Sequence, residues 1–352
     1  MQTILIHSSF GNNDRIFNPN ERDGYNDPMI YLRERFDQLG YSLKAADNNS
    51  LADCKWVFFF DATSVIPYSG WRGIARKLKA RLNGNPLIRD LYSECIRKGM
   101  EQRIALFLWE APAVSPANWD PELHKLFPLI FTWHANYVDG NKFIKIHWPQ
   151  TRQFPYVPNI QFKNKKLLVN ISMNKFSSHP RELYSARRAA IRYFEQNQPE
   201  NFDLYGVGWN RPVNIFEKIL PITRQIYPSY RGTVNNKWDV LPQYRFSLCY
   251  ENIYDEPGYV TEKIFDSMRA GCVPVYWGAP NIITEYVDPE AFIDRRKFKS
   301  DEELGTFLLG ITEKEYLMYQ VAIQEYLYSE KFQMFLPPAF AETIINALKL
   351  KN

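Results

Sequence analysis

Short apolar runs alternate with helical stretches through the first 150 residues of the chain. The predicted strands are Gln2–His7, Lys55–Phe60 and Arg103–Trp109, and the predicted helices are Pro28–Leu39, Trp71–Leu82 and Pro86–Lys98. The second and third strands are apolar without alternation, which is typical of strands covered by helices on both faces. This order of elements predicts a parallel α/β sheet.

A second series of the same kind begins near residue 166. Its predicted strands are Lys166–Ser172, Phe202–Tyr205, Arg245–Tyr250 and Val273–Tyr276, and its predicted helices are Arg181–Gln196, Val260–Ala270, Asp301–Leu309, Glu313–Glu330 and Ala339–Leu350. Between the two series, prolines and aromatic residues crowd from Pro112 to Pro158, which indicates long loops and a linker. The chain is therefore expected to fold as two Rossmann-like domains, residues 1–158 and 159–330, facing each other across a cleft, with a helical tail at 331–352.

Composition and charge exclude several classes of protein. The 352 residues are 45% hydrophobic and 23% charged, with a formal net charge of +4, too small for a dedicated nucleic-acid surface. No apolar run approaches the roughly 20 residues that span a bilayer, and no secretory leader precedes the first strand. The four cysteines are widely spaced without a C-x-x-C pair, which favours reduced, buried thiols over disulfides or zinc ligands. We expect a cytoplasmic protein, with peripheral contact at the inner face of the membrane left open.

The densest motif surrounds the start of one predicted helix. A strand ends at Glu251-Asn252, and a helix begins near Thr261 after a loop. The first turn brings together backbone N–H groups, the positive end of the helix dipole and the ammonium of Lys263, a combination that attracts phosphate. The neighbouring Glu262 could accept hydroxyls of a ribose or sugar. The alternative is that Glu262 only favours a helix N-terminus and Lys263 is a solvated surface residue.

The string YEN…GYVTEKIFDSMRAGCVPVYWGAPNI resembles the signature of the α-1,3/4-fucosyltransferases, glycosyltransferase family ten. The likeness is close from Tyr244 to Phe298 and looser from about Arg103 to the C-terminal helices. It implies a GT-B architecture, an acceptor site in the N-terminal domain, a GDP-fucose site in the C-terminal domain and inversion at the anomeric carbon of fucose. It also implies that the donor is bound by four residues of the motif: Asn252, Tyr259, Glu262 and Lys263.

The resemblance also implies an arginine on the first helix of the donor domain. Arg187 fits best, with apolar residues three, four and seven positions later, and Arg188 is its rival. An arginine can bind two diphosphate oxygens at once, which a lysine cannot. The chain departs from the family upstream, where Asn174 stands two residues late. The alternative is that both arginines line a solvated helix face.

Inverting transfer needs a carboxylate that takes the proton of the acceptor hydroxyl. The family's base is a glutamate at a strand end, in a motif like F-E-S/N-P, and the segment from Leu108 to Pro112 matches it with Ala111 where Ser or Asn is commoner. Independently, Glu110 follows a buried strand at the carboxyl edge of the sheet, where ligands of such sheets bind. Asp61 meets the same geometric test and is the second candidate. His7 is the third, with a structural role favoured for it.

The chain lacks the Asp-x-Asp pair of metal-dependent nucleotide-sugar enzymes. We therefore expect no required cofactor, with the leaving diphosphate neutralised by Lys263, Arg187 and helix amides, and a divalent ion stimulatory at most.

The predicted function is transfer of fucose from GDP-fucose to a glycan acceptor by an inverting α-1,3- or α-1,4-fucosyltransferase of the bacterial type. The acceptor is left open between GlcNAc of a lactosamine unit and a surface-polysaccharide sugar, because Trp133–Gln153 fits the family poorly. One alternative is a GT-B enzyme for another nucleotide sugar. The other is a non-catalytic glycan-binding protein, against which the pairing of Glu110 with Lys263 argues.

Overall fold

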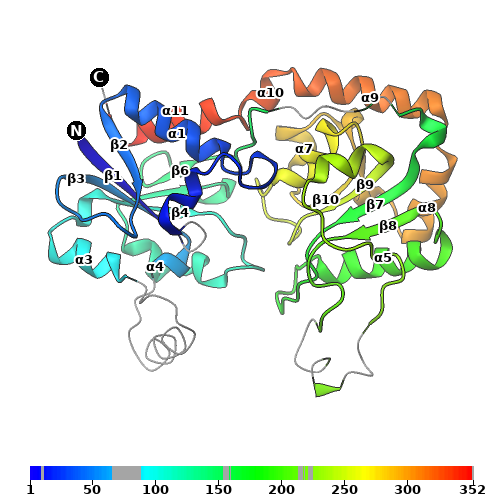
Figure 1. Ribbon diagram of the computed structural model, residues 1–352, viewed down its shortest axis with the longest axis horizontal. Helices are drawn as coiled ribbons and strands as arrows, with labels where there is room; N and C mark the ends of the chain where they lie inside the picture. Colours follow the sequence, from blue (N-terminus) through cyan, green and yellow to red (C-terminus); the bar gives the residue numbers. More distant parts are fainter. Residues whose placement is uncertain are drawn as a thin grey trace. The chain divides into compact units, whose positions relative to one another are not determined.

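The computed structural model describes residues 1–8, 12–65, 89–153, 158, 160–212, 217, 219–220 and 225–350. The chain divides into two compact domains, each with its own parallel sheet (Figure 1). The first domain comprises Met1–Glu21, Asn26–His147 and Pro337–Asn352, and the second comprises Arg22–Tyr25 and Trp148–Leu336. The predicted helix at Trp71–Leu82 lies outside the described residues.

The first domain is built on a six-stranded sheet in the order β2-β1-β3-β4-β5-β6. Its strands are β1 (Gln2–Ser8), β2 (Tyr41–Ala45), β3 (Cys54–Phe60), β4 (Ile104–Leu108), β5 (Leu129–Thr132) and β6 (Phe143–Lys145). Every neighbouring pair is parallel. The strand order reverses between β1 and β3, so the carboxyl ends of these strands form the switch point of the sheet.

Helices cover both faces of this sheet. One face carries α1 (Asp27–Gln38) and α11 (Pro337–Ala347), which lie side by side (Figure 1) and bury Phe36 and Phe340 against Phe58 and Phe107. The other face carries α3 (Leu91–Arg97) and α4 (Pro121–Lys125) over a second apolar cluster. Central strands buried on both faces explain why β3 and β4 read as continuous apolar runs.

The second domain has a five-stranded parallel sheet in the order β11-β10-β9-β7-β8. The strands are β7 (Lys166–Ile171), β8 (Phe202–Tyr205), β9 (Tyr244–Tyr250), β10 (Val273–Trp277) and β11 (Ile293–Asp294). Its helices are α5 (Tyr184–Asn197), α7 (Glu262–Arg269), α8 (Asp301–Gly310), α9 (Glu313–Leu327) and α10 (Glu330–Gln333). The order reverses between β7 and β9, which makes their carboxyl ends the switch point here.

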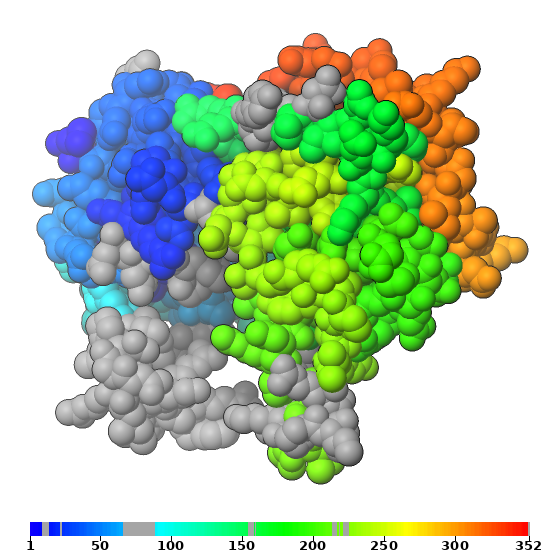
Figure 2. Space-filling model, turned by 45° about the vertical axis from the view of Figure 1, so that its right-hand side comes forward, coloured from blue at the N-terminus to red at the C-terminus, as the bar shows by residue number. Residues whose placement is uncertain are grey.

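The helices α8 and α9 of the second domain each bury only one face. The surface of α8 and α9 is orange in Figure 2. On α9, the apolar side chains of Leu317, Met318 and Val321 are exposed, whereas Tyr316 and Ile323 face the core. A capping box at Thr312 and Glu315 starts α9, satisfying backbone groups that the first turn would leave unpaired. The long C-terminal helices are thus held by one face and by their caps.

Three expectations from the sequence were wrong. The stretch 112–158 is not only loops and linker, because it contains α4, β5 and β6 of the first sheet. The domains divide between His147 and Trp148 instead of after residue 158. Residues 331–352 are not a separate tail, since α11 supplies core residues to the first domain.

Two further observations bear on the expected class of protein. No helix in the described part of the chain is long and apolar enough to cross a membrane. All four cysteines are free and buried, as the spacing predicted: Cys54, Cys95, Cys249 and Cys272.

Candidate active site

The motif residues of the second domain gather at the switch point of its sheet. Strand β9 ends at Tyr250, Glu251 and Asn252 follow at its carboxyl end, and α7 begins after Thr261. The hydrophobic side of α7 packs on the sheet through Ile264 and Met268. The first turn of α7 is thereby held at the sheet edge where ligands of parallel α/β sheets bind.

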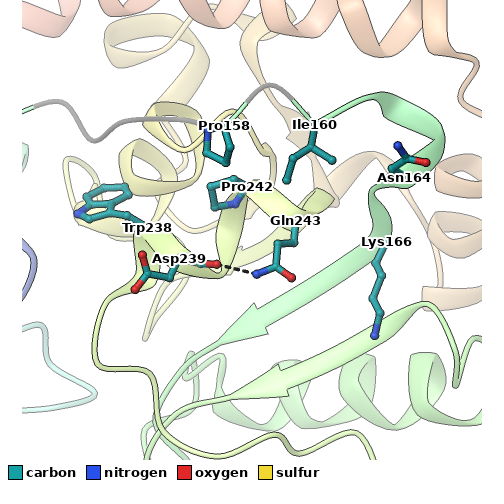
Figure 3. A pocket seen from close by; sticks show the side chains of 8 residues that line it. All are labelled: Pro158, Ile160, Asn164, Lys166, Trp238, Asp239, Pro242 and Gln243. Atoms are coloured by element: carbon teal, nitrogen blue, oxygen red, sulfur yellow. Dashed lines mark hydrogen bonds between the residues drawn. The ribbon is translucent and has the colours of Figure 1, made fainter.

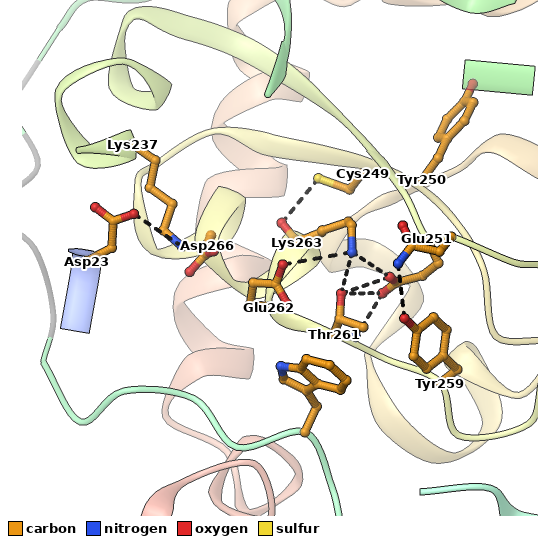
Figure 4. Close-up of polar contacts among 12 residues, drawn as sticks. Asp23, Lys237, Cys249, Tyr250, Glu251, Tyr259, Thr261, Glu262, Lys263 and Asp266 are labelled. Atoms are coloured by element: carbon orange, nitrogen blue, oxygen red, sulfur yellow. Dashed lines mark hydrogen bonds and ion pairs between the residues drawn. The ribbon is translucent and has the colours of Figure 1, made fainter. Parts of the chain in front are cut away.

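Lys263 lies in a largely buried ionic cluster at the start of α7 (Figure 4). Its Nζ donates hydrogen bonds to Glu251 Oε2 at 3.0 Å and to Thr261 Oγ1 at 2.9 Å. Glu251 is 0% exposed, and its carboxylate also accepts bonds from the Thr261 backbone N–H and hydroxyl, both at 2.8 Å. We call Glu251, Thr261 and Lys263 the Glu251 cluster. Lys263 is therefore not the solvated surface residue of the alternative interpretation.

The electrostatics of the cluster keep Lys263 charged. Burial lowers the pKa of Lys263, but the carboxylates of Glu251 and Glu262 outweigh burial and hold it above its ordinary value. Glu262 Oε1 lies 3.8 Å from Nζ, so one ammonium faces two carboxylates. The ammonium alone therefore brings no excess positive charge for a diphosphate. The amides of the first turn can add to it, because the Thr261 side chain makes no cap bond to them.

Arg187 contacts the backbone of this cluster, whereas Arg188 bonds elsewhere. Arg187 is 3% exposed, and its Nη2 donates to the backbone carbonyls of Tyr250 and Glu251 at 2.5 and 3.0 Å. Its Nε is buried without a hydrogen-bond partner among the described residues. Arg188 Nη1 donates to the Lys175 carbonyl at 2.7 Å. Arg187 thus ties α5 to the end of β9, and the alternative of a solvated helix face is wrong for it.

Asn252 and Tyr259 form a pair on the loop between β9 and α7. The Asn252 side-chain amide donates to the Tyr259 hydroxyl at 3.2 Å. The ring of Tyr259 is 1% exposed and makes an edge contact with Trp148, whereas Asn252 is partly exposed. Asn252 is therefore the more accessible of the two for contact with a donor.

A second charged group occupies the next turn of α7, and sequence reasoning did not find it. Lys237 Nζ pairs with Asp266 and lies 3.8 Å from Asp23 Oδ2 (Figure 4). Burial raises the pKa of Asp266 to about 6 although Lys237 opposes it. Among the described residues, His, Cys, Asp and Glu side chains form no group of three suited to a metal ion.

The candidate base belongs to the first domain. Glu110 lies two residues after the end of β4, its backbone N–H donates to Asp61 Oδ1 at 3.0 Å, and its carbonyl accepts from Trp119 Nε1 at 3.2 Å. Asp61 follows β3 and is 2% exposed. His7, at the end of β1, is 5% exposed, and burial lowers its pKa. The three candidates thus lie at the carboxyl edge of the sheet, with Glu110 the least buried of them.

Glu251 is the residue that sequence reasoning missed. The motif predicts binding roles for Lys263 and Glu262, but it assigns no role to Glu251. A signal was present, because a carboxylate directly after the seven-residue strand β9 has to be buried and therefore needs a partner. The cation twelve positions later supplies it.

A pocket of the second domain lies away from these residues. It measures about 610 Å³ and lies at the amino ends of the strands, where Lys166 starts β7 and Gln243 precedes β9 (Figure 3). Its lining residues are Pro158, Ile160, Asn164, Lys166, Trp238, Asp239, Pro242 and Gln243. The Glu251 cluster is at the opposite edge of the same sheet.

Comparison with known proteins finds a family match in the second domain. Residues 171–334 match the family model described as glycosyltransferase family 10 (fucosyltransferase), C-terminal part. The α-(1,3)-fucosyltransferase FucT of Helicobacter pylori is 41% identical over 70 residues, which is 20% of this chain and 14% of that protein. An α-(1,4)-fucosyltransferase of Arabidopsis thaliana is 41% identical over 68 residues, 19% of this chain and 16% of the relative. The matched segments thus span less than a fifth of these relatives.

Solved structures extend the likeness to both domains. An α-1,3-fucosyltransferase crystal structure aligns with 99% of this chain and 90% of its own, at 16% identity and a TM-score of 0.57. A structure described as α-1,3-fucosyltransferase with GDP-fucose gives 0.52 at 15% identity, with 99% and 90% coverage. An α-glucosyltransferase in complex with UDP-glucose and DNA gives 0.54 at 10% identity, with 99% and 98% coverage. These neighbours show the GT-B fold, and within it residues 171–334 are similar to the C-terminal part of glycosyltransferase family 10.

Proposed function

We propose that the protein transfers fucose from GDP-fucose to a hydroxyl of a glycan acceptor, with inversion at the anomeric carbon and an α-1,3 or α-1,4 linkage. The observation that carries the proposal is the start of α7 at the switch point, where the Lys263 ammonium, fixed by Glu251 and Thr261, acts together with the first turn of the helix. A cation and the first-turn amides of a helix at the switch point of a parallel sheet suit a nucleotide diphosphate. The names of the family and of its relatives support fucose as the sugar.

Donor binding is proposed for five residues of the second domain. Lys263 and the first-turn amides of α7 would hold the diphosphate, and Glu262, whose side chain is 36% exposed, would accept hydroxyls of the ribose. Asn252 and the Tyr259 hydroxyl would contact the donor from the loop. Arg187 would add its positive charge from below, through the backbone that it holds.

Glu110 is the proposed general base. The acceptor oxygen attacks C1 of fucose as its proton passes to the Glu110 carboxylate, and the bond from C1 to the GDP oxygen breaks. The charge that develops on GDP falls to Lys263 and the helix amides, which are oriented before the reaction begins. Replacing Glu110→Gln should lower the rate of transfer by a factor of about 10² to 10⁴, the usual contribution of a positioned base.

No metal is required in this proposal, because protein groups neutralise the leaving diphosphate. Transfer should therefore persist in excess EDTA, with a divalent ion stimulatory at most. Complete loss of activity in EDTA that added Mg²⁺ or Mn²⁺ restores would refute this part of the proposal.

The deciding experiment incubates the protein with GDP-fucose and glycans bearing terminal lactosamine or surface-polysaccharide sugars, and reads the products by mass spectrometry. A mass increase of one fucose, absent with Glu110→Gln, supports the proposal. A parallel panel of GDP-mannose and UDP-sugars tests the second candidate, a transferase for another nucleotide sugar. That candidate is favoured by the UDP-glucose enzyme that shares the fold.

We also propose a cytoplasmic location, in which the enzyme contributes to polysaccharide biosynthesis or protein glycosylation. Four buried, unpaired thiols are typical of a reducing compartment. Cell fractionation would test it, and recovery of the protein with membranes instead of the soluble fraction would indicate peripheral attachment.

A further inference from the structure

Asp61 has a backbone conformation that few residues other than glycine adopt. It follows β3 at the switch point of the first sheet, with φ 60° and ψ 162°. This region is strained for any residue with a Cβ, and such strain persists where the surroundings fix the residue. The Asp61 amide donates to the Phe107 carbonyl at 2.9 Å, which continues the pairing of β3 with β4 past its last residue.

The Asp61 carboxylate holds the segment that carries Glu110. Its Oδ1 accepts hydrogen bonds from the backbone N–H of Trp109 at 2.8 Å and of Glu110 at 3.0 Å, and a third from Asn118 Nδ2. Asp61 is 2% exposed, so these charge-assisted bonds form away from water. Two consecutive amides bound to one oxygen fix the direction in which the chain leaves β4.

Asn118 completes the clamp from the other side. It is 0% exposed, its Nδ2 also donates to the Glu110 carbonyl at 3.1 Å, and its Oδ1 accepts from the Ala62 amide at 2.7 Å. Both backbone polar groups of Glu110 are therefore held by one buried pair. The same pair fixes the residue after Asp61, which links the strained turn to the Glu110 segment.

We propose that Asp61, with Asn118, is a positioning residue that sets the place of the Glu110 carboxylate for proton transfer. The inference rests on the proposed function of Glu110. Asp61 itself acts through the backbone and not on the acceptor, because its Oδ1 already accepts three donors in the protein interior. Displacement of a reacting group by about 1 Å costs on the order of 10²-fold in rate, which is why a strained residue can be worth keeping here.

The test compares Asp61→Gly, Asp61→Asn and Glu110→Gln. Asp61→Gly removes the clamp but suits the backbone conformation, so kcat should fall by about 10² while the KM for GDP-fucose stays within about twofold. Asp61→Asn keeps an oxygen that can accept the same bonds and should restore most of the activity. Asp53→Gly is the matched control, because Asp53 has φ 56° at the other end of β3 and is exposed; it should behave as wild type.

Hydrogen exchange supplies a readout that does not depend on activity. In Asp61→Gly, the amides of Trp109 and Glu110 should lose protection while those of β4 keep it. If Asp61→Gly does not fold, Asn118→Ala, which removes the other half of the clamp, should show the same pattern. A wild-type kcat in Asp61→Gly, or native protection at residues 109 and 110, would overturn the inference.

Two outcomes separate the inference from the proposed function. An Asp61→Asn variant as inactive as Glu110→Gln, with native exchange, would mean that Asp61 takes the proton itself. Full transfer by Glu110→Gln would instead refute the assigned base, and the exchange experiment would then decide whether Asp61 holds this segment.

Discussion

Each of the two sheets has a buried acidic residue at its switch point, but the two carboxylates bind different kinds of partner. At the switch point of the first sheet, the Asp61 carboxylate binds backbone amides of the next strand end. At the switch point of the second, the Glu251 carboxylate binds a side-chain ammonium and a threonine. Both acids are almost completely buried, at 2% and 0% exposure.

The difference lies in what each acid fixes. Asp61 fixes the path of the chain, so the group it positions can keep its own charge and exposure. Glu251 fixes a cation whose charge it also neutralises, so the second edge must draw on helix amides to bind an anion. A backbone clamp is therefore expected to affect geometry, and an ionic clamp to affect both geometry and stability.

The largest effect should come from breaking the ionic clamp. Lys263→Met leaves Glu251 buried without its cation, and we expect it to lower the free energy of unfolding by about 3–5 kcal/mol. The double variant Glu251→Gln with Lys263→Met removes both charges and should recover most of this loss. Urea unfolding of the three proteins at neutral pH measures it. A single variant as stable as the wild type would show that Lys263 is not what compensates Glu251.

A second ionic pair on α7 joins Asp266 to Lys237. Its pKa of about 6 lies above the ordinary 3.8, so the folded state binds the proton more tightly than the unfolded state. The stabilisation is present below about pH 4 and is lost as the pH rises through 6, about 3 kcal/mol in all at roughly 1.4 kcal/mol per pKa unit. Unfolding of wild type and Asp266→Asn from pH 4 to 7 measures this difference. A gap between the two proteins that does not change with pH would contradict the prediction.

Donor affinity should respond next. In the Glu251→Gln background, replacing Lys263→Met should weaken GDP binding by about 1.5–3 kcal/mol, or roughly 10- to 150-fold, because a charge-assisted contact to phosphate is lost. Titration calorimetry measures it. Lys331→Met is the control, since Lys331 pairs with Asp288 on the surface of the same domain, where the two side chains are 43% and 42% exposed. Equal affinities in all variants would argue against a diphosphate at Lys263.

The smallest effect is expected from an exposed ion pair of the first domain. Arg35 Nη2 on α1 lies 2.7 Å from Glu342 Oε1 on α11, and the side chains are 28% and 47% exposed. Glu342→Ala should cost at most about 1 kcal/mol, and less in high salt. Thermal unfolding at two salt concentrations tests this. A loss as large as that of Lys263→Met would mean that exposure is a poor guide to the strength of these pairs.

The central strands were predictable because their signal is local. β4 is apolar throughout and β3 is apolar from Trp56 to Phe60, a pattern that burial on both faces requires, whereas β9 was recognised by the alternation of Phe246, Leu248 and Tyr250. The edge strands were not predictable in the same way. β6 has three partly buried residues and β2 alternates without a long apolar run, so only their pairing with neighbours in the sheet makes them strands.

The residues of the candidate site also differ in how far the local sequence predicts them. Lys263 and Glu110 could be proposed from spacing and position relative to predicted strands. The partner of Lys263 lies twelve residues earlier, and Asp61 binds an amide 48 residues away. Such contacts depend on which strands are neighbours in the sheet, and the linear pattern carries no direct record of that order. Arg187 illustrates the limit, since its helix was predicted but its burial was not.

The core of the first domain includes a helix, α11, that is synthesised last. Its residues Phe340 and Ile344 fill the apolar layer above β3 and β4, yet they follow the whole second domain in the chain. During synthesis, the ribosome must therefore complete the second domain before the first can close its core. Until α11 is made, the aromatic side chains that it covers in the first domain stay exposed, and partly folded chains with such exposed surface are prone to aggregate.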